Sequence, residues 1–580
     1  MALVIQHRQP DQTLQLPDNL HPLIRRVLLR RRLGSSDELD LSLSNLLAPD
    51  SLLGVEGAVA LLTEQLQRQG RLLVVSDFDA DGATSCALAL RGLRALGFEN
   101  LDYIVPNRFE YGYGLTPEIV QLATARKPDL IITVDNGISS LAGVDAARRA
   151  GVEVLITDHH LPGAQLPAAA AIVNPNQPGC EFASKALAGV GVMFYLLLAL
   201  RASLREAGYF AGAAGRREPN LAELLDLVAL GTVADVVPLD RNNRILVNEG
   251  LKRIRAGRAC PGILALLQVS RRRREGLVAA DLGFAIGPRL NAAGRLDDMS
   301  LGIECLLTDS MDAAHAMAVQ LDSLNSDRRL IEGEMREQAF RNLDRLEIAT
   351  DAMPAGLCVY DSQWHQGVIG ILASRIKDKY HRPVIAFADA GVEAASGDEL
   401  KGSARSIPGF HIRDALDAIA SRHPGLISRF GGHAMAAGLS LEKGRLNEFQ
   451  AAFADYAGLM LEEEQLQARL VTDGELGPGE FAIDTAEAVI EAGPWGQGFP
   501  EPLFDGRFVV QDLRVLADKH LKMAVLPDGE DLEVEAIAFN ASFEDPLQVG
   551  DAVRLVYRLG VNDYRDLRRL QLVVEAFEKA

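Results

Sequence analysis

Five short apolar runs between Arg71 and Asn174 constrain the fold of this chain most strongly. They are residues 71–77, 101–106, 129–135, 152–158 and 170–174, separated by helix-like patterns such as 83–96 and 139–150. Buried strands that alternate with helices predict an α/β domain with a doubly wound, mostly parallel sheet. Three of the runs end in aspartate, and ligands bind at the carboxyl edge of such a sheet. The pattern therefore predicts an acidic site at that edge.

The other patterns divide the chain into further parts. Its 580 residues exceed what one hydrophobic core usually organises. Residues 311–347 lack proline and contain one glycine, which predicts a long connecting helix, and a second α/β rhythm begins at residue 357. The tail alternates apolar and polar residues, which predicts a small β-barrel. We therefore expect an N-terminal segment (1–49), an α/β domain (50–308), the connecting helix (309–347), a second, smaller α/β domain (348–460) and the barrel (461–580).

Asp77, Asp79 and Asp81 follow the first of these strands in the sequence SDFDADG. Three carboxylates within five residues repel one another unless cations neutralise them, so a metal site is expected. A calcium EF-hand loop would need a bidentate Glu at its twelfth position, where this chain has Leu88, and a helix in place of the preceding strand. A solvated acidic turn stays open for this motif taken alone.

Two more strand ends supply Asp135, in TVDNG, and Asp158, His159 and His160, in TDHH. Neighbouring parallel strands bring such residues to one crevice. Two adjacent histidines after an aspartate favour metal ligation or acid–base chemistry over a purely structural role. Asp235 lies among apolar residues at an expected helix end, where a buried carboxylate without a cation would be destabilising.

The set DFDADG, VDNGIS, DHH and GTVADVVPL resembles the signature motifs of the DHH phosphoesterase superfamily. Within it, the chain resembles the bacterial single-stranded-DNA-specific exonucleases, with their DHHA1 domain and oligonucleotide-binding (OB) fold domain. The motifs that carry this second resemblance are RFEYGYGL (108–115), PRLNAAGRLDD (288–298), WHQGVIGILASR (364–375), GSARS (402–406) and GGHAMAAG (431–438).

The resemblance implies hydrolysis of phosphodiesters in single-stranded DNA from the 5′ end, by a two-metal mechanism, in DNA recombination and repair. Two divalent cations can activate water and stabilise charge on the phosphate, and an oxygen-rich ligand set suits Mn²⁺ or Mg²⁺. Carried over by motif, the expected metal ligands are Asp79, Asp81, Asp135, His159 and Asp235, with Asp77 ranked lower. His160 and Asp158 are the expected catalytic residues that position groups or transfer protons.

Seven residues are expected to hold nucleic acid. Arg108 and Tyr111 follow the second strand, Arg289 and Arg295 lie in PRLNAAGR, and Ser403, Arg405 and His433 belong to the second domain. Arg108, Ser403 and Arg405 are expected to form a 5′-phosphate pocket. For Arg108, Tyr111 and His433, ordinary surface or packing roles stay open. Single-stranded-DNA-binding protein and RecQ-type helicases are the partners that the resemblance implies.

The formal net charge of −20 argues against a protein that coats nucleic acid indiscriminately. The charge is uneven, however. Residues 241–300 hold twelve Lys and Arg against five Asp and Glu, whereas residues 461–505 hold one Arg against eleven acids. The five cysteines are scattered, and no run is apolar and long enough for a leader or a membrane span, so we expect a cytoplasmic protein without a membrane partner.

Two other hypotheses stay open. One is a different DHH-superfamily phosphoesterase that acts on short oligonucleotides or cyclic dinucleotides, although the additional C-terminal domain favours a polymer. The other is a catalytically inactive DNA-binding scaffold, although such a scaffold has no evident need for mutually repelling carboxylates.

Overall fold

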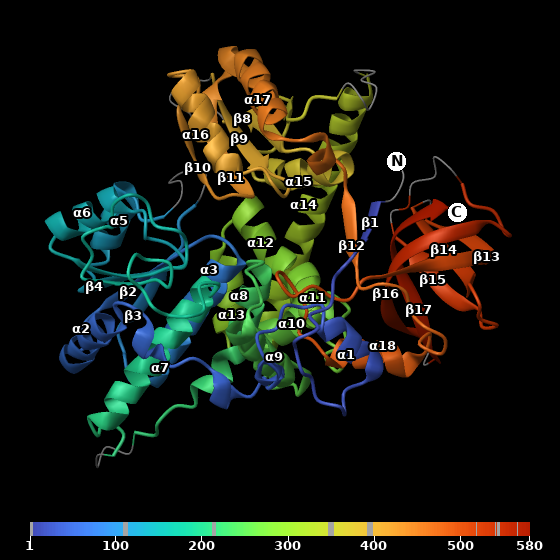
Figure 1. Cartoon of the computed structure of the whole chain (residues 1–580). Coiled ribbons are helices and arrows are strands. Elements are labelled where there is room, and N and C mark those ends of the chain that lie inside the picture. The colour runs from blue at the N-terminus through green and yellow to red at the C-terminus, as the bar shows by residue number, and fades with distance from the viewer. Residues whose placement is uncertain are drawn as a thin grey trace. The chain divides into compact units, whose positions relative to one another are not determined.

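The computed structural model of the chain describes residues 4–107, 114–211, 216–345, 353–390, 398–517, 519–539, 541, 546–564 and 567–580. The chain divides into two compact units (Figure 1). The larger unit comprises His7–Asn325 and Val471–Ala580, and the smaller unit comprises Met1–Gln6 and Ser326–Leu470. Among the described residues no single helix is both long and apolar enough to cross a membrane, and one sharply bent helix pair passes by length and composition only.

The larger unit is built around the predicted parallel sheet, in the order β3–β2–β4–β5–β6. Its strands are β2 (Leu72–Ser76), β3 (Leu101–Ile104), β4 (Leu130–Val134), β5 (Glu153–Thr157) and β6 (Ala171–Val173), and every neighbouring pair is parallel. The expectation of a doubly wound parallel sheet is therefore confirmed.

Helices cover both faces of this sheet (Figure 1). Leu72 and Val74 pack into the core formed with α2 (Val55–Arg68), α3 (Ala80–Ala95) and α7 (Gly189–Glu206). Leu73 and Val75 pack into a second core with α5 (Pro117–Ala125) and α6 (Leu141–Arg149). Successive side chains of a strand point to opposite faces, so a sheet covered on both sides needs continuous apolar strands.

A helical layer continues the larger unit. It contains α8 (Leu225–Ala234), α9 (Arg241–Arg255), α10 (Pro261–Val269), α11 (Ala279–Asp281), a π-helical turn (Leu282–Ile286), α12 (Gly287–Leu296) and α13 (Ser300–Leu307). The predicted connecting helix is α14 (Met311–Arg345), which passes from this unit into the smaller one.

The C-terminal residues form a closed five-stranded barrel, as expected of an OB-like domain. Its strand order is β13 (Phe504–Leu516), β14 (His520–Pro527), β15 (Val534–Ala538), β17 (Leu567–Lys579) and β16 (Ala552–Tyr564). Strand β12 (Arg469–Thr472) and helix α18 (Ile483–Glu491) precede the barrel. The N-terminal segment, with β1 (Val4–His7) and α1 (Pro22–Leu28), meets this region through a buried ion pair between Arg31 and Asp473.

The smaller unit contains a mixed sheet in the order β10–β11–β9–β8–β7. Its strands are β7 (Leu357–Tyr360), β8 (Val384–Asp389), β9 (Glu399–Arg405), β10 (Arg429–Gly432) and β11 (Ala436–Glu442), of which β7 and β8 are parallel. Ile385 and Phe387 of β8 pack against α16 (Ile412–Arg422) and α17 (Leu446–Met460). Val384 and Ala386 pack against α15 (Ile369–Tyr380), which confirms a second α/β domain.

Candidate metal centre

The acidic loop after β2 is held by helix N-termini. Asp79 caps α3, because its Oδ1 accepts a hydrogen bond from the Gly82 N–H at 3.0 Å. The carboxylate of Asp81 accepts the N–H groups of Gly189 at 2.6 Å and Val190 at 3.0 Å, in the first turn of α7. Unsatisfied amides and the positive end of a helix dipole stabilise such an anion. Asp81 is thereby fixed beneath the carboxyl edge of the sheet.

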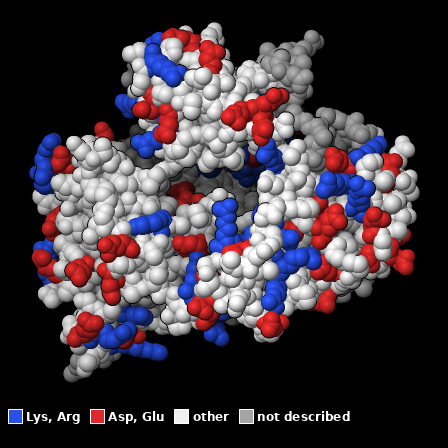
Figure 2. Space-filling model, in the orientation of Figure 1, with Lys and Arg blue, Asp and Glu red and all other residues white. Residues whose placement is uncertain are grey.

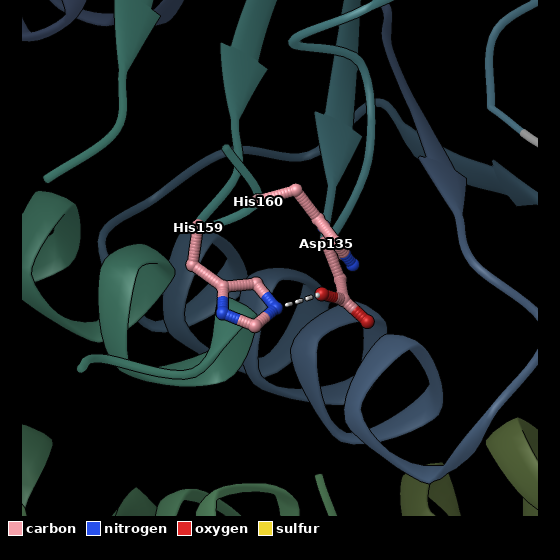
Figure 3. A group of neighbouring side chains, drawn as sticks. All are labelled: Asp135, His159 and His160. Atoms are coloured by element: carbon pink, nitrogen blue, oxygen red, sulfur yellow. Dashed lines mark ion pairs between the residues drawn. The ribbon is translucent and has the colours of Figure 1, made fainter. Parts of the chain in front are cut away.

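His159 and three carboxylates from separate elements converge at this edge. The Nε2 atom of His159 lies 3.1 Å from Asp135 Oδ1, 3.4 Å from Asp235 Oδ2 and 3.9 Å from Asp81 Oδ2. Figure 3 shows the His159 ring pointing toward the Asp135 carboxylate. Asp235 lies directly after the last residue of α8, which agrees with the predicted helix end.

The backbone at Asp135 and Val236 is unusual. Asp135 has a φ of 62° and Val236, next to Asp235, has a φ of 59°. Asp tolerates the left-handed region, but a β-branched valine rarely adopts it. Such conformations persist where the surrounding packing imposes them, and they are concentrated at functional sites.

Asp158 does not converge with the other acids, because backbone and ring donors already surround its carboxylate. Its Oδ1 accepts the N–H groups of His159 and His160 and lies 2.8 Å from Nδ1 of His160, and its Oδ2 accepts the N–H of Ile138. Burial alone would lower the pKa of His160, but the hydrogen bond and charge of Asp158 outweigh it and raise that pKa to about 9. Asp158 therefore orients His160 and favours its protonated form.

The carboxylates are protonated more readily than usual. Burial first, and then the charge of Asp79, raise the pKa of Asp81 to about 7. Burial and the neighbouring acids also raise the pKa values of Asp135 and Asp235 well above the ordinary range. A divalent cation would remove both causes, since it replaces hydration and cancels the repulsion.

The donor atoms fit divalent cations. Three sets of side chains each offer ligand atoms within 4.8 Å of one another, and these sets are Asp77–Asp79–Asp135, Asp81–His159–Asp235 and Asp135–His159–His160. Oxygen-rich sets with one or two imidazoles suit Mn²⁺ or Mg²⁺. Asp77, ranked below the other expected metal ligands, belongs to one of these sets together with Asp79 and Asp135.

The structure adds positioning residues that the sequence did not single out. Asn291 of α12 accepts the N–H of Ala80 at 2.7 Å through its Oδ1. Gly294, one turn further, packs against the carbonyl oxygen of Phe78. Asn176 donates to the carbonyl of His159 at 2.6 Å. Asn291 lies within the motif PRLNAAGR. An uncharged asparagine beside two arginines does not by itself indicate a positioning role, so the sequence pattern did not predict it.

The structure describes five of the seven residues that are expected to hold nucleic acid. Arg108 and Tyr111 lie outside the described residues. Arg289 donates from Nε to Asp322 at 2.8 Å and from Nη1 to the Ala285 carbonyl at 2.6 Å, and its side chain is only 13% exposed. Arg295 is half-buried on the same helix, α12.

Ser403, Arg405 and His433 all belong to the smaller unit. Strands β9 and β11 pair there with Arg405 opposite Ala436, and His433 lies in the exposed turn before β11. Arg405 Nη1 donates to Ser403 Oγ at 3.2 Å. Gly370, at the first turn of α15, lies against both side chains. The structure thus brings Ser403 and Arg405 together at a helix N-terminus.

Three family models match the chain. They are the DHH family N-terminal domain at residues 71–232, the DHHA1 domain at 354–459 and the RecJ OB domain at 472–576. Together with the metal centre, they define a metal-dependent phosphodiester hydrolase of the DHH class.

The single-stranded-DNA-specific exonucleases RecJ of Dickeya dadantii and Escherichia coli are 55% and 52% identical to the chain, and each alignment covers 98% of both proteins. The chain belongs to the RecJ family, which confirms the resemblance drawn from its motifs. The Thermus thermophilus RecJ structure with Mn²⁺ has a TM-score of 0.75 and 30% identity and covers 98% of this chain and 79% of that one. The Mg²⁺ complex of the same protein has a TM-score of 0.69.

Proposed function

We propose that this protein is a metal-dependent exonuclease that degrades single-stranded DNA from its 5′ end. The observation that carries this proposal is the metal centre of five aspartates and two histidines, in a chain about half identical to RecJ exonucleases along nearly its full length. The 5′→3′ direction comes from the family resemblance.

Two cation positions are proposed from the ligand sets. Asp77 and Asp79 would hold one cation, Asp81, His159 and Asp235 would hold the other, and Asp135 would contact both. Bound there, two divalent cations lower the pKa of a water and stabilise charge that develops on the phosphate. The N–H groups of Gly189 and Val190 keep Asp81 oriented throughout.

His160 is the proposed proton-transferring residue. Its Nδ1 is engaged by Asp158, so its Nε2 is the atom that would donate a proton or a hydrogen bond to a phosphate oxygen. In the metal-free protein, the hydrogen bond and charge of Asp158 raise the pKa of His160 to about 9. Asp158 acts through His160 and is a positioning residue.

The remaining proposed contacts bind the DNA strand. Ser403 and Arg405 combine a hydroxyl, a guanidinium and the N-terminus of α15, a combination that suits a phosphate. Arg108, Tyr111, Arg289, Arg295 and His433 remain proposed nucleic-acid contacts by motif. On the face shown in Figure 2, Lys and Arg are interspersed with Asp and Glu, so the charge of −20 forms no field of a single sign there.

The proposed setting is recombination and repair in the cytoplasm, beside single-stranded-DNA-binding protein and RecQ-type helicases. The division into residues 1–49, 50–308, 309–347, 348–460 and 461–580 is proposed with it.

End-labelled DNA tests this function. With Mn²⁺ the protein should release mononucleotides from the 5′ end of single-stranded DNA and leave duplex DNA intact. EDTA should abolish this cleavage. Asp81→Asn should be inactive, whereas Asp309→Asn, at an 88% exposed carboxylate, should match the parent. A preference for dinucleotides would favour another DHH phosphoesterase, and DNA binding without cleavage would favour the scaffold.

A further inference from the structure

Phe284 is the most exposed large hydrophobic residue among those that the structure describes, with 83% of its surface exposed. Its neighbours Leu282, Ala285 and Ile286 are buried. An isolated exposed leucine needs no explanation, but a nearly bare phenylalanine on a well-packed element loses the benefit of burial. The position of this ring therefore calls for a functional explanation.

The backbone that presents Phe284 is a π-helical turn, Leu282–Ile286, directly before α12. Such turns are rare and occur frequently at functional sites. Arg289 fixes this one from within the unit, because its guanidinium donates to the Ala285 carbonyl at 2.6 Å and to Asp322 at 2.8 Å. The turn is therefore a supported feature that holds the ring outward.

The same turn and the first residue of α12 pack against the end of α8, next to the expected metal ligand Asp235. A β-carbon on Gly283 would lie 3.3 Å from Val233 Cγ1, and one on Gly287 would lie 3.2 Å from the Ala234 β-carbon. Val233 and Ala234 are the last two residues of α8, immediately before Asp235. On its other side α12 holds the acidic loop through Asn291 and Ala80. One continuous segment of the chain thus connects Phe284 with the helix end before Asp235 and with the acidic loop after β2.

We propose that Phe284 stacks on a nucleobase of the single strand while the phosphate of a neighbouring nucleotide lies at the metal centre. This inference rests on the proposed function. Every base has a π-face, so an aromatic platform binds single strands without sequence preference. Base pairing and stacking within a duplex would hide that face, so the ring also favours single-stranded substrates.

A nucleobase fits this surface better than a protein does. Specific protein interfaces bury about 800 Å² on each partner. The π-helical turn offers one exposed apolar ring among buried residues, which matches the face of a single base. In the sequence, residues 241–300, which include Phe284, carry twelve basic against five acidic side chains, a balance that suits a phosphate backbone.

The test compares Phe284→Trp, Phe284→Leu and Phe284→Ala in the otherwise unchanged full chain. Phe284→Leu and Phe284→Ala should raise KM for single-stranded DNA by roughly 5- to 150-fold, as expected for the loss of one stacked base. Their kcat at saturation should stay near that of the parent. Phe284→Trp should keep the parental KM. Equal KM values for Leu and Trp would contradict stacking.

A double-mutant cycle that combines Phe284→Ala with abasic oligonucleotides identifies the base that contacts Phe284. Binding is measured by fluorescence anisotropy in an Asp81→Asn background, with single abasic sites at successive positions from the 5′ end. At one position the abasic site and Phe284→Ala should be non-additive, because each removes the same contact. Additivity at every position would overturn the proposal. So would a loss of thermal stability in Phe284→Ala with equal weakening on every oligonucleotide, which would indicate a contact within the protein. A parent that does not cleave single-stranded DNA would instead refute the proposed function.

Discussion

Gly189 lies so close to Asp135 that a β-carbon on it would be 2.6 Å from both Cβ and Oδ1 of the aspartate. The same glycine donates its N–H to Asp81 at 2.6 Å. One residue without a side chain therefore sets the spacing of two carboxylates that follow different strands of the sheet, Asp81 after β2 and Asp135 after β4.

Gly189→Ala should displace Asp135 and lower exonuclease activity by at least the roughly 10- to 100-fold typical of residues that orient metal ligands. Steady-state rates with Mn²⁺ measure this loss. Gly333→Ala is the matched control, since nothing lies within 4 Å of its β-carbon position in α14. That change should keep activity and stabilise the protein by about 1 kcal/mol through helix propensity. Full activity in Gly189→Ala would show that the contact relaxes without consequence.

Asp135→Asn should nearly abolish cleavage and yet raise the melting temperature in EDTA. Burial and the charges of Asp81, Asp79, Asp77 and Asp235 disfavour the Asp135 carboxylate in the metal-free protein, and an amide removes that repulsion. Thermal unfolding with and without Mn²⁺ measures both effects. A lower melting temperature in EDTA, with unchanged stabilisation by Mn²⁺, would contradict this role.

Stabilisation by Mg²⁺ should increase with pH. The pKa of Asp81 is about 7 in the folded protein against an ordinary value of 3.8, so its contribution to metal-free stability is present at low pH and is lost as the pH rises through 7. A cation must displace that proton below pH 7, which weakens the apparent affinity by about tenfold per pH unit for each proton. The shift in melting temperature with Mg²⁺ should be larger at pH 8.5 than at pH 5.5.

His160→Gln should lose the most stability near pH 6. The pKa of His160 is raised from 6.5 to about 9, so its pairing with Asp158 stabilises the fold fully below pH 6.5, and this contribution is lost as the pH rises through 9. The difference between parent and variant should shrink by on the order of 2–3 kcal/mol between pH 6 and pH 10. Urea unfolding in EDTA measures it, and a difference that does not change with pH would refute the pairing.

Arg31→Met should destabilise the larger unit by roughly 1.5–3 kcal/mol, because it removes the more buried of the two arginines that pair with Asp473 and leaves Arg8 as the remaining cation. The Arg31 and Asp473 side chains are 2% and 0% exposed. Arg25→Met, which breaks an exposed pair with Asp18, should change stability by less than about 1 kcal/mol. Chemical unfolding of the full chain compares the two variants, and equal effects would show that the buried pair has no special role.

The sequence by itself determined the elements and most of the chemistry. Continuous apolar runs specified a sheet covered on both faces, and the aspartates at their ends marked its ligand-binding edge. Both signals are local, because they depend only on the residues within each run and directly after it. Asp81, Asp135, His159 and Asp235 were all named from motifs, and the structure places them around one point.

Tertiary structure decided which neutral groups hold these acids and which groups the nearby arginine Arg289 contacts. Gly189 and Asn291 lie 54 and 210 residues from Asp135 and Asp81, and neither has a charge that would draw attention in the sequence. Arg289 stays a proposed nucleic-acid contact, and only the structure shows that its guanidinium also donates to the Ala285 carbonyl and to Asp322. The exposure of Phe284 is likewise a property of the fold alone, since the type of a residue does not say whether it is buried. Close approach, pairing and exposure depend on distances between segments far apart in the chain, and local sequence patterns carry no information about those distances.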